Sequence, residues 1–166
     1  MTGRRRQVRG VTPSDRHAAL LRATLGADAE SAASLRQWSA MVDFDDIDGA
    51  EQRLMPLLYL SRGADLDHPA GGRIAGLYRR SWLRNQHLAH VATEAVAPLV
   101  EEGIDIIVLK GLSLSQRAYD DRGARPMGDV DVLVRAQDRQ RCFDLLVAAG
   151  WRAKGPMGQL RFDRPA

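Results

Sequence analysis

Paired cysteines, long apolar runs and a hydrophobic leader are all missing from this sequence of 166 residues. The single cysteine, Cys142, excludes an internal disulfide and favours a reducing compartment. It falls on the apolar face of a predicted helix, as a buried core thiol does. No stretch approaches the roughly 18 apolar residues of a membrane-spanning helix, and the arginine-rich start lacks the apolar segment of a signal peptide. These absences predict a cytoplasmic protein with no membrane partner.

Basic charge is also scarce once the first residues are set aside. The net charge is +3, but Arg4, Arg5, Arg6 and Arg9 all lie within the first nine residues. Without them the remainder carries +3 − 4 = −1, so a nucleic-acid partner is not expected. Residues 1–11 have almost nothing apolar to bury, which predicts a disordered basic arm.

The composition that remains is that of a soluble globular protein. Apolar residues make up 45% of the chain and charged residues 27%, and the length suits about one domain. The hydrophobic pattern changes along the chain, which predicts a helical region over residues 12–102 and an α/β core over residues 103–166. Helices are predicted at 15–25, 28–42, 48–61, 73–102, 111–119 and 136–149. Strands are predicted at 104–110, 129–134, 151–153 and 159–162.

Two acids, Asp129 and Asp131, stand two residues apart at the start of a predicted strand. Side chains alternate along a strand, so both would project to one side, about 7 Å apart. A hard divalent cation relieves their repulsion, and Mg²⁺ is bound by one or two carboxylates together with substrate phosphates. Alternatively, this is an exposed strand end whose acids pair with Arg125 or Arg135. The acid pair alone does not decide between the two interpretations.

A glycine turn earlier in the chain favours the metal interpretation. Gly111 follows a predicted buried strand and opens a predicted helix, where backbone N–H groups can bind phosphate. Lys110 adds a cation and Ser113 a hydroxyl in the same turn. The succession of strand, glycine turn, helix, loop and paired acids predicts a triphosphate cradle that faces a metal site.

The segments LKGLSL (109–114) and AYDDRGARPMGDVDVLV (118–134) resemble the uncharacterised nucleotidyltransferase family of the DNA polymerase β-like superfamily. A weaker likeness extends over residues 50–163. The resemblance implies an α+β fold in which an N-terminal helical region packs with a small mixed sheet of polymerase β-like type. It also implies transfer of a nucleoside monophosphate from a nucleoside triphosphate, with ATP expected, to a hydroxyl of a small molecule or a protein. Metal ions would stabilise the attacking and leaving oxygens.

The resemblance also assigns roles to individual residues. Asp129 and Asp131 would be catalytic and hold Mg²⁺, while Gly111 and Ser113 would contact the β and γ phosphates. Arg125 would neutralise phosphate charge through its planar guanidinium. Lys110, in the same turn, completes the predicted nucleotide-binding set. In the superfamily the turn glycine is usually followed by glycine or serine; here leucine follows, which leaves the identity of the phosphate-contacting group open.

A third carboxylate, contributed by a later strand, is usual in such enzymes. The sequence offers only Asp163 in a suitable place, and its spacing suits the loop before the expected strand. We therefore expect the third ligand to be missing and the α/β core to be incomplete at its C-terminal end. A fragment, a natural short form and a catalytically impaired relative, acting as a binding or antitoxin-type module, all remain open, so the sequence leaves enzymatic activity undecided.

Other chemistry-bearing residues have simpler interpretations. His87, His90 and Glu94 share a face of the long predicted helix at metal-ligand spacing, but a solvated helix face is the favoured reading. The tryptophans are predicted to lie in the core: Trp38, Trp82 and Trp151.

Overall fold

The computed structural model describes residues 12–66, 69–154 and 161–163, so the predicted basic arm lies outside the described residues. Packing divides the chain into two compact units, which are separated between Leu77 and Tyr78, inside helix α4 (Gly71–Glu101). The secondary structure changes from helical to mixed after α4, close to residue 103 where the sequence predicted it. The domain limits at residues 11 and 102 remain predictions.

The first unit is helical, as predicted. Ser14 caps its first helix, because the Ser14 side chain accepts a hydrogen bond from the backbone N–H of His17, and the helix ends at Gly26. The helices of this unit, before α4, are α1 (Asp15–Leu25), α2 (Asp28–Met41), the 3₁₀ helix η1 (Phe44–Asp46), α3 (Gly49–Arg62) and the 3₁₀ helix η2 (Gly63–Asp65).

Helix α3 begins with a capping box that also ties it to α1. The Asp48 side chain accepts from the N–H groups of Ala50 and Glu51, and the Glu51 carboxylate accepts from the Asp48 N–H. Glu51 is fully buried, and its Oε2 lies 2.6 Å from an Nη of Arg16 in α1. A buried carboxylate is tolerated when it is paired and hydrogen-bonded in this way.

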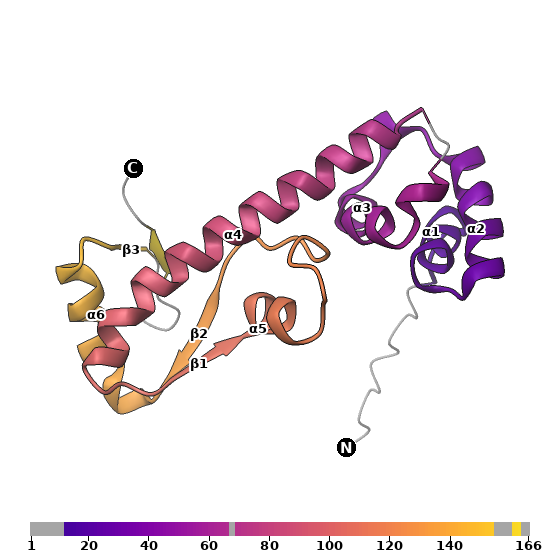
Figure 1. The fold of residues 1–166 in the computed structure, drawn as a ribbon. Helices are drawn as coiled ribbons and strands as arrows, with labels where there is room; N and C mark the ends of the chain where they lie inside the picture. The colour runs from indigo at the N-terminus through magenta and orange to yellow at the C-terminus, as the bar shows by residue number, and fades with distance from the viewer. Residues whose placement is uncertain (1–11, 67–68, 155–160, 164–166) are drawn as a thin grey trace, which may run out of the picture. The chain divides into compact units, whose positions relative to one another are not determined.

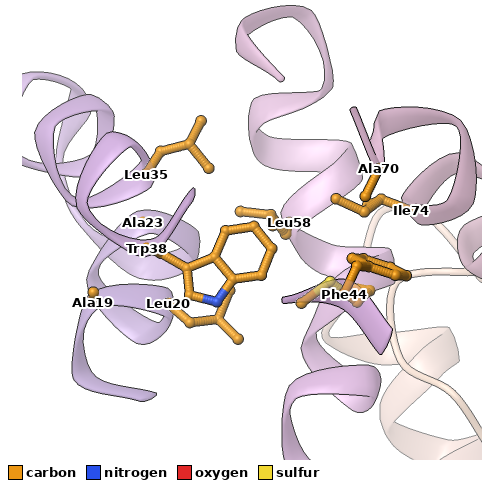
Figure 2. Packing of buried hydrophobic residues seen from close by; sticks show 10 residues of the cluster. Ala19, Leu20, Ala23, Leu35, Trp38, Phe44, Leu58, Ala70 and Ile74 are labelled. Atoms are coloured by element: carbon orange, nitrogen blue, oxygen red, sulfur yellow. The ribbon is translucent and has the colours of Figure 1, made fainter. Parts of the chain in front are cut away.

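The core of the first unit surrounds Trp38. Figure 2 shows its indole pointing from α2 toward Leu58 of α3, with Phe44 of η1 nearby. The prediction that Trp38 lies in the core is confirmed. The buried apolar residues of this cluster are Ala19, Leu20, Ala23, Leu35, Trp38, Phe44, Met55, Leu58, Ala70 and Ile74.

The second unit contains two pairs of short strands, in the regions where the sequence predicted strands. It comprises the C-terminal part of α4, β1 (Ile106–Leu109), α5 (Lys110–Arg117), β2 (Asp131–Val134), the 3₁₀ helix η3 (Ala136–Asp138), α6 (Arg139–Ala148), β3 (Arg152–Lys154) and β4 (Arg161–Asp163). Strand β1 pairs with β2 (Figure 1) and β3 pairs with β4, and both pairs are antiparallel. The described residues are therefore α+β as predicted. The prediction of a mixed sheet was wrong, because both described strand pairs are antiparallel.

The antiparallel pairing follows from the connection between β1 and β2. Leu109, the last residue of β1, faces Asp131, the first residue of β2, so the chain leaves and re-enters the sheet at the same end. A parallel pair would need a crossover that returns the chain to the opposite end. Here α5 and the loop after it connect the two strands at one end of the sheet.

One face of the β1–β2 pair packs on the second core. Ile106 and Val134, which are cross-strand partners, pack against the buried cluster of Leu99, Ile104, Cys142 and Leu146. Cys142 is buried as predicted, and burial raises the pKa of its thiol. On the other face the partners Ile107 and Leu133 are 59% and 53% exposed. The sheet is thus covered on one face only around Ile106 and Val134, so the prediction of a buried strand over residues 104–110 was wrong for Ile107.

Trp82 and Trp151 differ in their surroundings. Trp151 packs against the second core, in line with the sequence. Trp82 is 38% exposed and lines a shallow open pocket with Tyr78, Arg79 and Leu83, so its assignment to the core was wrong. None of the described helices is long and apolar enough to span a bilayer.

Candidate active site

The turn between β1 and α5 carries a rare backbone conformation. Lys110 has a φ of +47°, and it is the non-glycine residue with positive φ among the described residues. This conformation costs a non-glycine residue about 1–2 kcal/mol. It lets the chain pass from Leu109 directly into α5, whose N-terminus has no side-chain cap. The first N–H groups of α5 are therefore not bonded to a capping side chain.

The Lys110 side chain reaches across the end of the sheet to one of the two predicted metal ligands. Its Nζ lies 3.0 Å from Oδ2 of Asp131, and both side chains are open to solvent. The pairing of Leu109 with Asp131 explains the contact, because Lys110 follows the strand position that faces this acid. The glycine turn and the second acid of the D-x-D motif thus lie together.

Gly111 is packed closely by the loop that precedes β2. A Cβ atom added to Gly111 would come within 2.8 Å of an Nη of Arg125 and within 3.1 Å of the Met127 sulfur. The missing side chain therefore makes room for the Arg125 guanidinium, a close approach that only glycine allows. Met127 is buried, while Arg125 remains half-exposed.

The structure does not bring Asp129 and Ser113 into a described contact with the Lys110–Gly111 turn. The strand begins at Asp131 and not at Asp129, so side-chain alternation does not extend back to Asp129, which is exposed in the preceding segment. Ser113 is the fourth residue of α5 and is half-buried. The roles of both in binding a metal or a phosphate remain predictions.

Asp163, the only candidate for a third carboxylate, ends β4, although the sequence predicted a loop there. It faces Arg152 of β3 in the second strand pair. The β3–β4 pair is a separate sheet among the described residues, so backbone pairing does not bring Asp163 beside Asp131. The Asp163 side chain lies outside what the structure describes.

Two carboxylates near the exposed end of a sheet suit a hard divalent cation. Carboxylate oxygens are ligands that Mg²⁺ prefers, and a cation held by Asp131 would compete with the Lys110 ammonium for this carboxylate. The Arg125 guanidinium against Gly111 provides further positive charge on the side where phosphates would bind. These are residue types that could bind a magnesium–polyphosphate ligand.

The side chains of α4 that hold the loop before β2 were not predicted from the sequence. Asn85 is 2% exposed and bonds to the loop backbone, as does Arg84. A signal was present, because Asn85 follows Tyr78 by seven residues and Trp82 by three, which places a polar residue on the apolar face.

A second group of possible metal ligands lies in the first unit. His17, Asp48 and Glu51 have ligand atoms within 4.8 Å of one another. The His17 ring bonds to Ser14 and to Asp48, and Glu51 is held by Arg16, so each group already serves to join α1 to α3. Among the described residues His87, His90 and Glu94 of α4 do not form such a group, and His90 Nε2 lies 3.7 Å from Glu94 Oε1.

The family model of the uncharacterised nucleotidyltransferases matches residues 49–164. The chain belongs to this family. Comparisons with curated proteins and with solved structures found no match.

The match to this nucleotidyltransferase family begins at α3 and leaves out α1 and α2. It contains the whole described part of the second unit, and with it Lys110, Gly111, Arg125, Asp129 and Asp131. The resemblance recognised in the sequence over residues 50–163 is therefore confirmed.

Proposed function

We propose that this chain is a Mg²⁺-dependent nucleotidyltransferase of polymerase β-like type. It would move a nucleoside monophosphate, from ATP or another nucleoside triphosphate, to a hydroxyl of a small molecule or a protein. One observation carries the proposal: Asp131 of β2 and the Lys110–Gly111 turn of β1 lie at the same end of one strand pair, joined by an ion pair.

The side chains at this end have complementary tasks. Asp131, with Asp129, would hold Mg²⁺, which when bound supplies positive charge to the oxygens that gain charge in nucleotidyl transfer. Lys110, Arg125 and the uncapped N-terminus of α5 would bind and orient the triphosphate. Orientation matters most here, because the acceptor hydroxyl must attack the α-phosphate in line with the departing pyrophosphate.

The test is binding and turnover of ATP by the full chain. Isothermal titration calorimetry with ATP, with and without Mg²⁺, measures binding, and release of pyrophosphate measures transfer. Asp131→Asn and Asp129→Asn should each remove the dependence of ATP affinity on Mg²⁺, because a carboxylate is lost while the shape is kept. Wild-type protein whose ATP affinity does not respond to Mg²⁺ would contradict the proposal.

Asp105→Asn is the matched control. Asp105 is an exposed acid at the other end of the same strand pair, where it bonds Arg135 at 2.7 Å. This substitution changes the net charge by the same amount as Asp131→Asn, so it should leave ATP binding unchanged. Equal losses in the two variants would mean that general charge, and not a metal site, controls binding.

A second candidate is a nucleotide-binding module without turnover. It is supported by the position of Asp163 on β4, which pairs with β3 and not with the strand that carries Asp131. Such a module binds MgATP as the enzyme does but releases no pyrophosphate. The two measurements above therefore separate the candidates.

A further inference from the structure

The loop between α5 and β2 is hydrogen-bonded along one face of α4, and Asn85 is the centre of this contact. The Asn85 Nδ2 donates to the carbonyl oxygens of Arg122 and Arg125, at 2.6 and 2.8 Å. Its Oδ1 accepts from the N–H of Met127 at 3.1 Å. The amide thus uses both donor hydrogens and its acceptor on backbone groups of one loop.

Neighbouring side chains of α4 bind the same loop at other points. Ser81 donates to the carbonyl of Gly123 at 2.8 Å, and the Tyr78 hydroxyl donates to the Asp121 carboxylate at 3.0 Å. Arg84 donates to the carbonyl of Met127 at 2.9 Å and to that of Gly128 at 3.3 Å. Residues 121–128 are therefore fixed from Asp121 to the residue before Asp129.

The residues that Asn85 binds are those that reach the glycine turn. Its backbone partners include Arg125 and Met127, and the side chains of these two residues are the ones that crowd Gly111. Asn85 is buried, whereas the Arg125 side chain is half-exposed, and its guanidinium makes no hydrogen bond or ion pair with the described residues. The position of the guanidinium is thus determined mainly by the backbone to which it is attached.

We infer that Asn85 is a positioning residue for triphosphate recognition, which acts by fixing the backbone of Arg125. The inference rests on the proposed function, in which Arg125 binds phosphate. No other side chain of similar size replaces the amide, because aspartate lacks the two donors and leucine lacks all three groups. A binding residue held in place beforehand loses less conformational entropy when its ligand arrives.

The test is a double-mutant cycle between Asn85 and Arg125, measured as MgATP affinity of the full chain by calorimetry. Asn85→Ala should weaken binding about tenfold in the wild-type background, within the range found for coupled residues. In the Arg125→Ala background the same substitution should change the affinity less than about twofold, because the group that Asn85 positions is already gone. A role in stability alone predicts equal factors in both backgrounds, and this result would overturn the inference, as would wild-type affinity in Asn85→Ala.

Two further variants keep the test decisive. Asn85→Ala removes the side-chain partner of three backbone groups of the loop, so a milder variant guards against unfolding. Ser81→Ala removes a single bond to the same loop and should show the same dependence on Arg125, with a smaller factor. Gln86→Ala is the control. The Gln86 side chain accepts a hydrogen bond from the exposed Arg122 side chain and makes none to the loop backbone among the described residues, so this variant should bind MgATP as wild type does. If Arg125→Ala itself binds MgATP normally, the proposed role of Arg125 fails, which is a different result from additive losses.

Discussion

Replacing Gly111 by alanine tests the close approach on which the candidate site depends. The added methyl would lie 2.8 Å from an Nη of Arg125 and 3.1 and 3.2 Å from the sulfur and Cγ of Met127. The guanidinium is the end of a flexible side chain, so it can turn away. Met127 is buried and must shift by a few tenths of an ångström.

Gly111→Ala should change the free energy of unfolding only slightly, because two effects oppose each other. Alanine is favoured over glycine in a helix by about 1 kcal/mol, and Gly111 is the second residue of α5. Overpacking at a close contact costs about 1–3 kcal/mol, and the lower end applies where a neighbour can move. We therefore expect the free energy of unfolding to change by less than about 1 kcal/mol.

Nucleotide binding should change far more. A hydrogen bond between charged groups contributes about 1.5–3 kcal/mol, so moving the Arg125 guanidinium should weaken MgATP binding about tenfold or more. Urea unfolding measures the stability and calorimetry the affinity. The control is Gly128→Ala in the same loop, where an added Cβ meets nothing within 4 Å and binding should stay normal. A Gly111→Ala protein that is folded and binds MgATP as tightly as wild type would refute the reasoning.

Two further predictions concern the first unit. Glu51→Gln should lower the free energy of unfolding by about 3 kcal/mol in urea titrations, because the buried carboxylate is the partner of Arg16; an effect below about 1 kcal/mol would contradict this. The pKa of Asp48 is lowered below its ordinary 3.8, most by the hydrogen bond from the N–H of Glu51 and less by His17 and the N–H of Ala50. The ionised Asp48 therefore contributes to stability above pH 3.8, and this contribution is lost as the pH falls through the lowered pKa. Asp48→Asn should therefore flatten the fall of the melting temperature in acid, and an unchanged slope would show that other carboxylates cause it.

Local signals predicted most of the secondary structure. Ser14 and Gly26 mark the ends of α1, and both act there in the structure. The β-branched run before Lys110 predicted a strand, and Ile106–Leu109 form one. These features depend on neighbours in the sequence, which is why they can be read from it.

The features that sequence analysis missed depend on contacts between distant segments. Alternation of side chains does not specify the partner of a strand, so the antiparallel pairing of β1 with β2 was not predicted. The burial of Asn85 depends on the loop at residues 121–128, which packs along α4. A single asparagine on an apolar helix face indicates a buried partner but does not identify it.

The strain at Lys110 bears on whether the candidate site is a surface feature or a binding site. A positive φ costs lysine about 1–2 kcal/mol, and an exposed ion pair such as that with Asp131 contributes about 0–1 kcal/mol. The ion pair therefore does not offset the strain, and glycine at this position would avoid the steric penalty. Stability alone gives no reason for a lysine there. A polyphosphate ligand, as proposed, would give one, because an ammonium group beside the uncapped N-terminus of α5 adds positive charge where the first N–H groups of the helix have no capping side chain.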